Sequence, residues 1–114
     1  MIRSLKLDKT FSQDLSLGAL SYTTAFGRKF KLEQVAIHFS QAVSETITIT
    51  LDSKHGPAYD TVLQEVTLIS ESDFVYRPQG EANFQDGDEI KIQCTNANTV
   101  GTASGICKTS EILI

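Results

Sequence analysis

Apolar and polar residues alternate along much of the chain, and this alternation predicts a protein built from β-strands. The clearest cases are the segments ETITITLD (45–52) and EIKIQCT (89–95). Successive side chains of a strand point to opposite faces of the sheet, so a period of two gives each strand one apolar face. The predicted inward residues of these two strands are Ile47, Ile49, Leu51, Ile90, Ile92 and Cys94.

A third strand is predicted over KFKLEQVAIHFS (29–40), with an irregularity in its middle. The apolar positions change phase by one residue at Glu33–Gln34, and one extra residue in a strand makes a β-bulge. We therefore expect a bulge there and place His38 on the outward face. The predicted inward residues are Phe30, Leu32, Val35, Ile37 and Phe39.

The remaining apolar segments predict further strands, separated by turns that contain Gly or Pro. These segments are 2–8, part of 12–26, 59–69, 73–77 and 105–114. The expected faces carry Val62, Gln64, Val66 and Leu68 in one strand, and Phe74 and Tyr76 opposite Val75 in another. A single helical turn is expected near Ser70–Asp73. The apolar C-terminus is expected to pair beside the N-terminal strand.

These elements predict one all-β domain, 1–114, with about eight antiparallel strands in a jelly-roll-like β-sandwich. The segment 1–18 has few turn residues and also suits an extended N-terminal arm. Such an arm can add a strand to the sheet edge of a neighbouring molecule.

Composition and charge narrow the classes of function. The chain has 114 residues, of which 40% are hydrophobic and 21% charged, as in ordinary folded domains. Its net charge of −4 argues against a protein that mainly binds nucleic acid. The apolar runs are too short to cross a membrane, and no leader sequence is predicted. We therefore expect a protein made and used in the cytosol.

The acidic stretch Asp86–Glu89 is the most site-like pattern, but it predicts a turn. It lacks the ligand spacing of a calcium loop. An Asp-Gly step favours a tight turn, and Asp88 is expected to accept hydrogen bonds from the backbone.

Other polar groups also lack the context that chemistry needs. Asp52, Ser53, His55 and Asp60 share one loop without the surroundings of a catalytic triad. The His and Cys residues lack zinc-site spacing. We expect no catalytic residue, no cofactor and no metal. The sequence leaves open whether Cys94 and Cys107 form a disulfide.

Two binding functions were weighed against these observations. Arg28, Lys29 and Lys31 form a small basic cluster, which is expected to be a solvated strand face because the chain is acidic overall. A carbohydrate-binding module stacks sugars on exposed aromatic residues. The chain has no Trp and only three Tyr, so sugar binding would depend on Tyr59 and polar loops.

Several short stretches, taken in order, resemble a known family. They are Ile37, TITLDS (48–53), Tyr59-Asp60 followed by Val62-Leu63, and GDEIKIQCTN (87–96). In this order the chain resembles small β-sandwich structural proteins of tailed bacteriophages, which are jelly-roll-like capsid decoration or cement proteins. The resemblance covers about residues 30–114.

The resemblance implies a virion protein without an active site. It would be made in the host cytoplasm and added to the capsid exterior, against the major capsid protein or other copies of itself. No membrane, nucleic acid or small-molecule substrate is implied. The expected interaction residues are Met1, Ile2, Arg3, Leu5, Leu7, Arg28, Lys29, Asn96, Asn98 and Thr99. The alternatives are a carbohydrate-binding module and a tail- or fibre-associated module.

Overall fold

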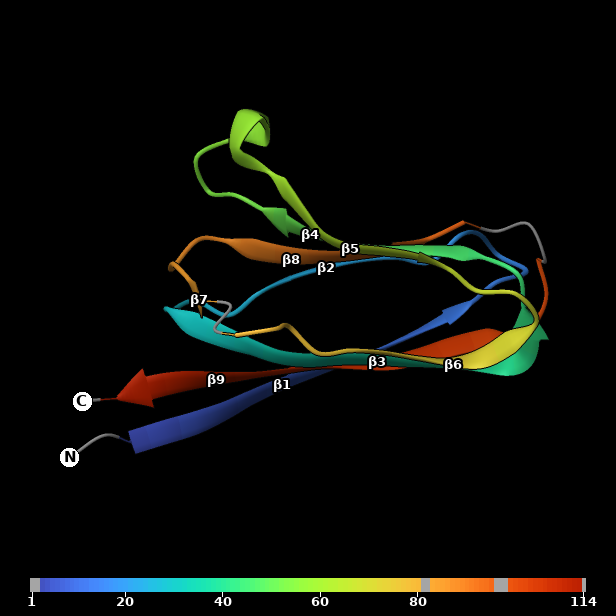
Figure 1. Cartoon of the computed structure of the whole chain (residues 1–114), viewed down its shortest axis with the longest axis horizontal. Helices are drawn as coiled ribbons and strands as arrows, with labels where there is room; N and C mark the ends of the chain where they lie inside the picture. Colours follow the sequence, from blue (N-terminus) through green and yellow to red (C-terminus); the bar gives the residue numbers. More distant parts are fainter. Residues whose placement is uncertain (1–2, 81–82, 96–98, 114) are drawn as a thin grey trace.

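The computed structural model describes the backbone of residues 3–80, 83–95 and 99–113, and the side chains among residues 6–111 of these ranges. Figure 1 shows two layers of strands packed face to face. The elements are β1 (Arg3–Asp14), β2 (Ser21–Ala25), β3 (Phe30–Val43), β4 (Thr46–Asp52), the 3-10 helix η1 (Pro57–Tyr59), β5 (Thr61–Thr67), β6 (Glu71–Tyr76), β7 (Asn83–Phe84), β8 (Glu89–Cys94) and β9 (Thr102–Leu113). The predicted all-β sandwich is confirmed, and the two-residue β7 was not predicted.

The strand order is that of a jelly roll. One sheet has the order β1-β9-β3-β6, with β7 also paired to β3, and the other has the order β2-β8-β4-β5. The pairs are nested along the chain: β1 pairs with β9, β2 with β8, β3 with β6 and β4 with β5. Every pair is antiparallel. The predicted pairing of the C-terminal strand beside the N-terminal strand is confirmed.

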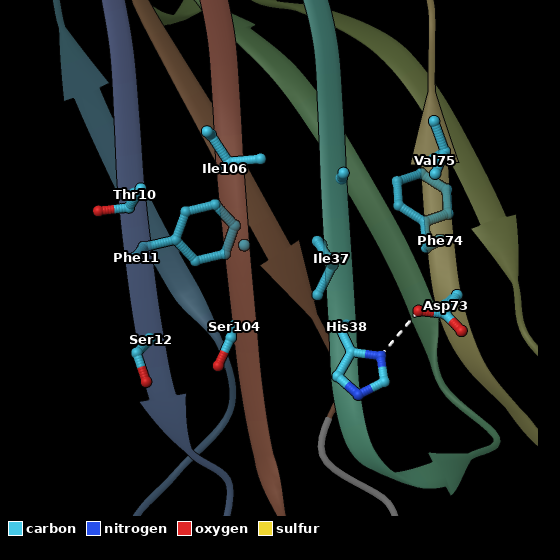
Figure 2. A pocket seen from close by; sticks show the side chains of 12 residues that line it. Thr10, Phe11, Ser12, Ile37, His38, Asp73, Phe74, Val75, Ser104 and Ile106 are labelled. Carbon is cyan, nitrogen blue, oxygen red and sulfur yellow. Dashed lines mark hydrogen bonds and ion pairs between the residues drawn. The ribbon is translucent and has the colours of Figure 1, made fainter.

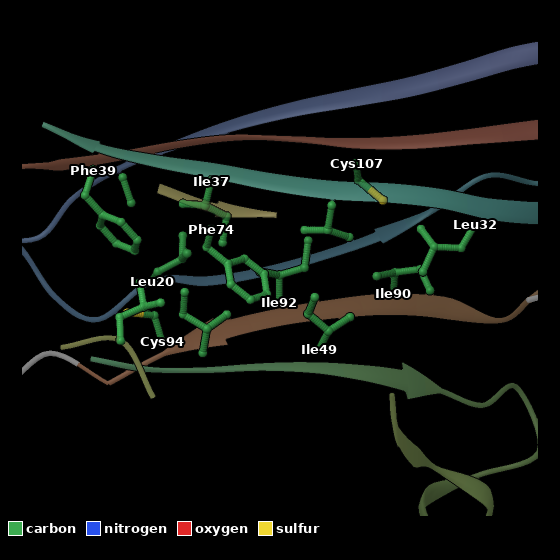
Figure 3. Packing of buried hydrophobic residues seen from close by; sticks show 14 of the residues in the cluster. Leu20, Leu32, Ile37, Phe39, Ile49, Phe74, Ile90, Ile92, Cys94 and Cys107 are labelled. Atoms are coloured by element: carbon green, nitrogen blue, oxygen red, sulfur yellow. The ribbon is translucent and has the colours of Figure 1, made fainter. Parts of the chain in front are cut away.

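The core lies between the two sheets (Figure 3). Most of the predicted inward residues are buried there, because alternate residues of every strand face the opposite sheet. Ile47, Ile49, Ile90 and Ile92 are completely buried. Leu51 is only partly buried, near the end of β4. The other core residues include Leu15, Leu20, Phe30, Leu32, Val35, Ile37, Phe39, Phe74, Cys94 and Cys107.

Two irregularities decide which side chains reach this core. The register of β3 against β9 shifts between Leu32 and Gln34, which confirms the predicted bulge. A second shift, between Ile49 and Thr50 on β4, was not predicted. It turns Val62 outward, where 56% of the residue is exposed, and leaves Leu63 packed against the core. The prediction that Val62 shares one face with Gln64, Val66 and Leu68 is therefore wrong.

One further expectation needs correction. Residues 71–73 begin β6, so no helical turn forms near Ser70–Asp73. Ser70 instead has a left-handed backbone, with φ 52°, that turns the chain from β5 into β6. Within the segment 1–18, β1 pairs along its whole length with β9 of the same chain. Residues 3–14 therefore form the edge strand of the larger sheet, hydrogen-bonded to β9 on one side.

The sandwich is elongated, with extents of 47 × 30 × 24 Å. Both described chain ends lie at one end of the long axis, while four connections between strands lie at the other (Figure 1). The β4–β5 hairpin, which carries η1, projects away from the smaller sheet near the end that holds the termini.

Candidate binding surfaces

Four connections form the end of the sandwich that lies away from the termini. We call it the loop end: residues 15–20, 44–45, 68–70 and 95–101, of which 96–98 are not described. Hydrogen bonds join each connection to the next, so the loops are held as one unit. The bonds run from Leu15 N to Gly101 O (2.9 Å), Cys94 N to Leu20 O (3.1 Å), Thr95 N to Thr46 O (3.0 Å), Leu68 N to Glu45 O (2.7 Å) and Ser70 N to Ser44 Oγ (3.1 Å).

A buried carboxylate lies at the base of the loop end. Glu45 is only 1% exposed, and the Thr95 hydroxyl donates to its Oε1 at 2.8 Å. The Thr95 oxygen in turn accepts from Thr46 N at 2.9 Å. A buried acid is tolerated when hydrogen bonds replace its lost water. This contact fastens the β3–β4 connection to the start of the β8–β9 connection.

The loop end also exposes large aliphatic side chains. Leu17 is 82% exposed, Ile69 75% and Val100 45%, and each comes from a different connection. Ile69 precedes Ser70, and Val100 follows Thr99. Both Ser70 and Thr99 have a left-handed backbone, with φ of 52° and 54°. Left-handed backbone at residues other than Gly costs of order 1–3 kcal/mol and is common at functional sites. Exposed apolar side chains mark protein-binding sites where they gather into one patch.

A second surface is an apolar groove of about 660 Å³ on the outer face of the larger sheet. Figure 2 shows the side chains around it. Two rows of cross-strand neighbours cross the groove, since the strands are in register. One row is Thr10, Ile106, Ala36 and Val75, and the other is Ser12, Ser104, His38 and Asp73.

The second row places a Ser, a His and an Asp side by side, and these are the residue types of a catalytic triad. His38 Nδ1 lies 2.7 Å from Asp73 Oδ1, and their side chains are 64% and 72% exposed. Among the described contacts no hydrogen bond joins Ser104 to His38. A catalytic triad needs that bond, a buried acid and an oxyanion hole. Flat strands offer no such hole, because their N–H groups are used in the ladder. The row is therefore better suited to binding than to catalysis.

The acidic turn at Asp86–Glu89 has the structural role that the sequence predicted. Asp88 is 7% exposed and accepts from Gln85 N and Lys54 N, each at 3.0 Å. Burial alone would raise the pKa of Asp88, but the two backbone hydrogen bonds outweigh it and hold the pKa below its ordinary value. Gly87, with φ 100°, completes the turn under the Lys54 side chain. Asp88 thus ties the β4–β5 hairpin to the start of β8.

A third exposed feature is the tip of the β4–β5 hairpin. Tyr59 is 64% exposed and makes an edge contact with the His55 ring, with centroids 5.8 Å apart. The loop is ordered by its own hydrogen bonds, among them Ser53 N to Asp60 Oδ1 at 2.8 Å. A sugar needs an aromatic face beside polar groups. The tip offers one such face, on a projection and not in a groove.

The structure separates the interaction residues that the sequence suggested. Leu7, Arg28 and Lys29 lie toward the end that holds the termini, where Arg28 Nη1 contacts Glu111 Oε2 at 2.5 Å. Thr99 lies at the opposite loop end. The side chains of Arg3 and Leu5, and all of Met1, Ile2, Asn96 and Asn98, lie outside the described residues.

Sequence reasoning named Thr99 of the loop end but missed its exposed aliphatic residues. Leu17 and Ile69 were considered only as parts of the segments 12–26 and 59–69. Their one sequence signal is a large aliphatic residue beside Gly or Ser in a turn, as in LSLG (15–18) and LIS (68–70).

The cysteines and acids of the described residues form no reactive or metal-binding centre. Cys94 and Cys107 are buried in opposite sheets, and both thiols are free. Within the described ranges, no group of three or more His, Cys, Asp or Glu is arranged to hold a metal ion. No helix among these residues has the length and apolar character needed to cross a membrane.

Comparisons with known proteins place this fold among viral capsid and sugar-binding structures. No protein-family model matches the sequence, and no curated protein sequence matches it. A chain of the acid-stable capsid of Helicobacter pylori bacteriophage KHP30 is similar in structure, with a TM-score of 0.65 and 7% identity. The similarity covers 99% of this chain and 97% of that one.

Two further solved structures are similar over most of this chain. A chain of the T13 particle of infectious bursal disease virus has a TM-score of 0.53 and 7% identity, over 98% of this chain but 30% of that one. The family 32 carbohydrate-binding module from C. perfringens NanJ, solved with galactose, has a TM-score of 0.57 and 13% identity, over 96% and 93% of the two chains. At these identities the likeness establishes the jelly-roll-like β-sandwich fold alone.

Proposed function

We propose that this chain is a non-enzymatic virion structural protein that binds the outer surface of a phage capsid as a decoration or cement protein. The observation that carries the proposal is the similarity to a chain of a phage capsid over 99% of one chain and 97% of the other. The likeness therefore extends over nearly all of both chains. A compact sandwich of this size suits an addition to a shell that other chains build.

The loop end is the surface that docks on the shell in this proposal. Leu17, Ile69 and Val100 project from three connections that hydrogen bonds hold together. Because hydrogen bonds already join the described residues of these connections, little of their conformational entropy is lost when the apolar side chains meet a partner. Burial of exposed aliphatic groups then stabilises the complex, at about 25 cal/mol for each Å² of apolar surface. The capsid partner is expected to offer an apolar depression between subunits.

Stabilisation of the shell requires that one bound molecule contact more than one capsid subunit. The chain is 47 Å long, and its loop end is formed by both sheets. A rigid end of this kind can bridge a junction, because the hydrogen-bonded loops resist being pulled apart. The same features would suit a tail- or fibre-associated module, so the position in the virion must be measured.

The first experiment is mass spectrometry and cryo-electron microscopy of virions from the phage that encodes the chain. We expect the chain in purified particles, with density on the capsid exterior and the loop end toward the shell. Density at the tail would support the tail-associated alternative. Absence of the chain from purified virions would overturn the virion proposal.

The docking surface is tested with particles stripped of the chain and purified protein added back. The double variant Leu17→Asp, Ile69→Asp should co-sediment with particles much less than the parent, since it places charge in an apolar contact. Val62→Asp is the control, because Val62 is also exposed, at 56%, but lies on β5, outside the loop end and the groove. Equal binding of the double variant and the parent would contradict the loop end as the docking surface.

Carbohydrate binding is the alternative that a specific observation favours. The fold is similar to a module solved with galactose, and Tyr59 is exposed on an ordered loop. A glycan array with the isolated chain would detect this function, and Tyr59→Ala should abolish the signal. Tyr76→Ala is a suitable control, since Tyr76 packs partly against the core. A glycan signal that Tyr59→Ala leaves unchanged would rule out the hairpin tip as the sugar site.

A further inference from the structure

The outer edge of β1 is a long strand edge that can pair with another strand. β1 is the terminal strand of the larger sheet, and among the described residues β9 is its sole partner strand. The pairing with β9 runs without a register shift from Arg3 to Asp14. An uninterrupted edge of this kind exposes a row of N–H and C=O groups.

The direction of these groups follows from the contacts with β9. Leu15 N donates to Gly101 O, and the Thr109 hydroxyl donates to Leu7 O, so odd-numbered residues direct their backbone toward β9. Consecutive residues of an antiparallel strand direct their backbone groups to opposite sides. Even-numbered residues, including Lys6, Asp8 and Thr10, therefore direct theirs to the open edge.

The charges on this edge are self-complementary in one register. Lys6 and Asp8 are two residues apart, so both side chains lie on the same face of the sheet. If two copies of β1 pair antiparallel about a twofold axis at Leu7, Lys6 of each copy lies opposite Asp8 of the other. An axis at Lys6 would instead oppose two lysines, and an axis at Asp8 would oppose two aspartates. Like charges directly opposite each other are destabilising.

The same register also satisfies the backbone. Lys6 and Asp8 are both even-numbered, so the pair they form across the axis exchanges N–H···O=C hydrogen bonds. Leu7 then lies at the axis in a non-hydrogen-bonded pair, where side chains approach most closely. Leu7 is partly buried, and its counterpart would extend the apolar surface on that face.

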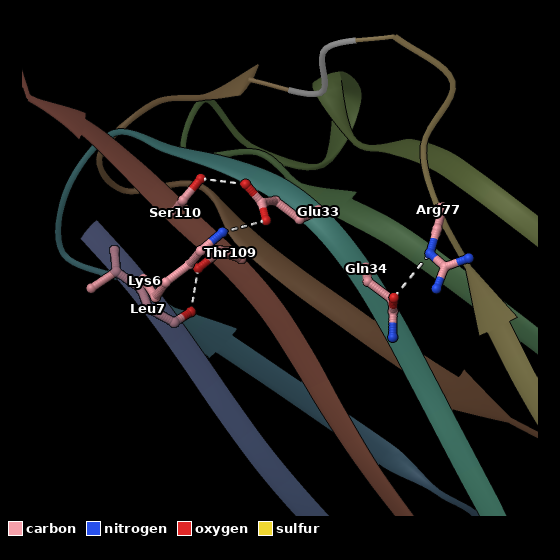
Figure 4. Close-up of polar contacts among 7 residues, drawn as sticks. All are labelled: Lys6, Leu7, Glu33, Gln34, Arg77, Thr109 and Ser110. Atoms are coloured by element: carbon pink, nitrogen blue, oxygen red, sulfur yellow. Dashed lines mark hydrogen bonds and ion pairs between the residues drawn. The ribbon is translucent and has the colours of Figure 1, made fainter. Parts of the chain in front are cut away.

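The Lys6 side chain is already ordered by an ion pair that reaches across β9 to Glu33 of β3. Its Nζ lies 2.9 Å from Glu33 Oε2, while Ser110 Oγ donates to Glu33 Oε1 at 2.8 Å (Figure 4). The Lys6 side chain remains 66% exposed, so its ammonium has N–H groups left for a second carboxylate. An exposed ammonium on the edge strand can attract an acid at the matching position of an incoming strand.

We propose that two copies of this chain pair through their β1 edges, antiparallel about Leu7, and so join the two larger sheets into one continuous sheet. The partner is a second copy, identified by the opposition of Lys6 and Asp8 across the axis. This interface lies along the side of the sandwich and leaves the loop end uncovered. Pairing of the two β1 edges requires no capsid partner.

Analytical ultracentrifugation of the full chain, without any capsid, tests the interface. The parent should form a dimer whose fraction rises with concentration. Asp8→Lys should raise the dimer dissociation constant roughly tenfold or more, because two attractive charge pairs become repulsive. Lys6→Glu should have the same effect. An equimolar mixture of the two variants should associate with an affinity near that of the parent, since every pair across the axis is again of opposite charge.

The controls separate a lost interface from a lost fold. Asp86→Lys makes the same charge change in an exposed turn away from β1 and should leave the dimer unchanged. Circular dichroism and melting temperature check that each variant is folded. Hydrogen exchange should show the amides of Lys6, Asp8 and Thr10 protected in the dimer. A parent that stays monomeric up to millimolar concentration overturns the proposal, and so does a dimer that survives Asp8→Lys.

Discussion

The ring of Phe11 occupies the space that a side chain at Gly105 would need. A Cβ placed on Gly105 would lie 2.2 Å from Phe11 Cζ, far inside van der Waals contact. The two residues face each other across the β1–β9 pair. The Phe11 ring also stacks on Tyr22 of the opposite sheet, with centroids 4.7 Å apart. This contact joins the two sheets at the edge where β1 and β2 lie.

Gly105→Ala should destabilise the fold for that reason. The added methyl group forces Phe11 away from Tyr22, and overpacking of this kind costs about 1–3 kcal/mol. Chemical denaturation measures the free energy of unfolding. Ser104→Ala is the matched control on the same strand, because Ser104 points outward and is exposed. Equal free energies of unfolding for Gly105→Ala and the parent would show that the Phe11 ring does not occupy the space beside Gly105.

Ile49 and Ile92 lie opposite each other on β4 and β8, and both are completely buried. Ile49→Ala or Ile92→Ala should lower the free energy of unfolding by about 2–5 kcal/mol, because each leaves a cavity in the core. Thermal or urea unfolding gives the measurement. Thr23→Ala, at an exposed position of β2, should change stability little. If both isoleucine variants melt with the parent, the assigned inward face is wrong.

Asp88→Ala should cost about 1–3 kcal/mol, since it removes the carboxylate that accepts hydrogen bonds from Gln85 N and Lys54 N. Hydrogen exchange should then be faster in the loop 53–60, which loses its attachment to β8. Asp86→Ala provides the comparison, because Asp86 lies in the same turn but is exposed. Similar losses for the two variants would mean that the turn, and not the carboxylate, carries the stability.

Glu33 should make the free energy of unfolding depend on pH in the acid range. The Lys6 hydrogen bond, helped by Ser110, holds the pKa of Glu33 below its ordinary value of 4.5. A carboxyl with a lowered pKa contributes stability above that ordinary value, and the contribution is lost as pH falls through the folded-state pKa. The parent should therefore lose more stability than Glu33→Gln between about pH 5 and pH 3 in urea titrations. Parallel pH profiles for the two proteins would contradict this role.

The two thiols should be inert in the folded protein. Burial, with a smaller effect of Glu45, raises the pKa of Cys94 to about 11, and burial, with a smaller effect of Asp8, raises that of Cys107 to about 12. The thiolate is the reactive form, so labelling by a disulfide reagent near pH 8 should be slow. Both thiols should react at once in guanidinium. Rapid labelling of the native chain would show that the core opens locally.

The local pattern of the sequence determined the fold class and most of the core. The period of two identified the strands around Ile49, Ile92 and Ile37, because alternation reports which side of a strand is buried. The phase slip at Glu33–Gln34 revealed a bulge, since a shift in that period is visible in one strand alone. Asp88 was recognised as a turn residue because one of its two hydrogen bonds, from Gln85 N, is local, whereas the bond from Lys54 N was not predicted.

Features that depend on the partner strand could not be predicted from the sequence in the same way. The bulge on β5 follows from its register against β4, so Val62 was placed on the wrong face. The segment 1–18 was compatible with a free arm, and only its pairing with β9 made it an edge strand.

The binding surfaces, too, were decided by the tertiary structure. Leu17, Ile69 and Val100 are far apart in sequence, and the nested strand order brings their loops to one end. Lys6 and Asp8 are ordinary charges in the sequence. They become candidates for binding a second chain because β1 lies at the sheet edge, and only an edge strand has backbone groups left for another chain.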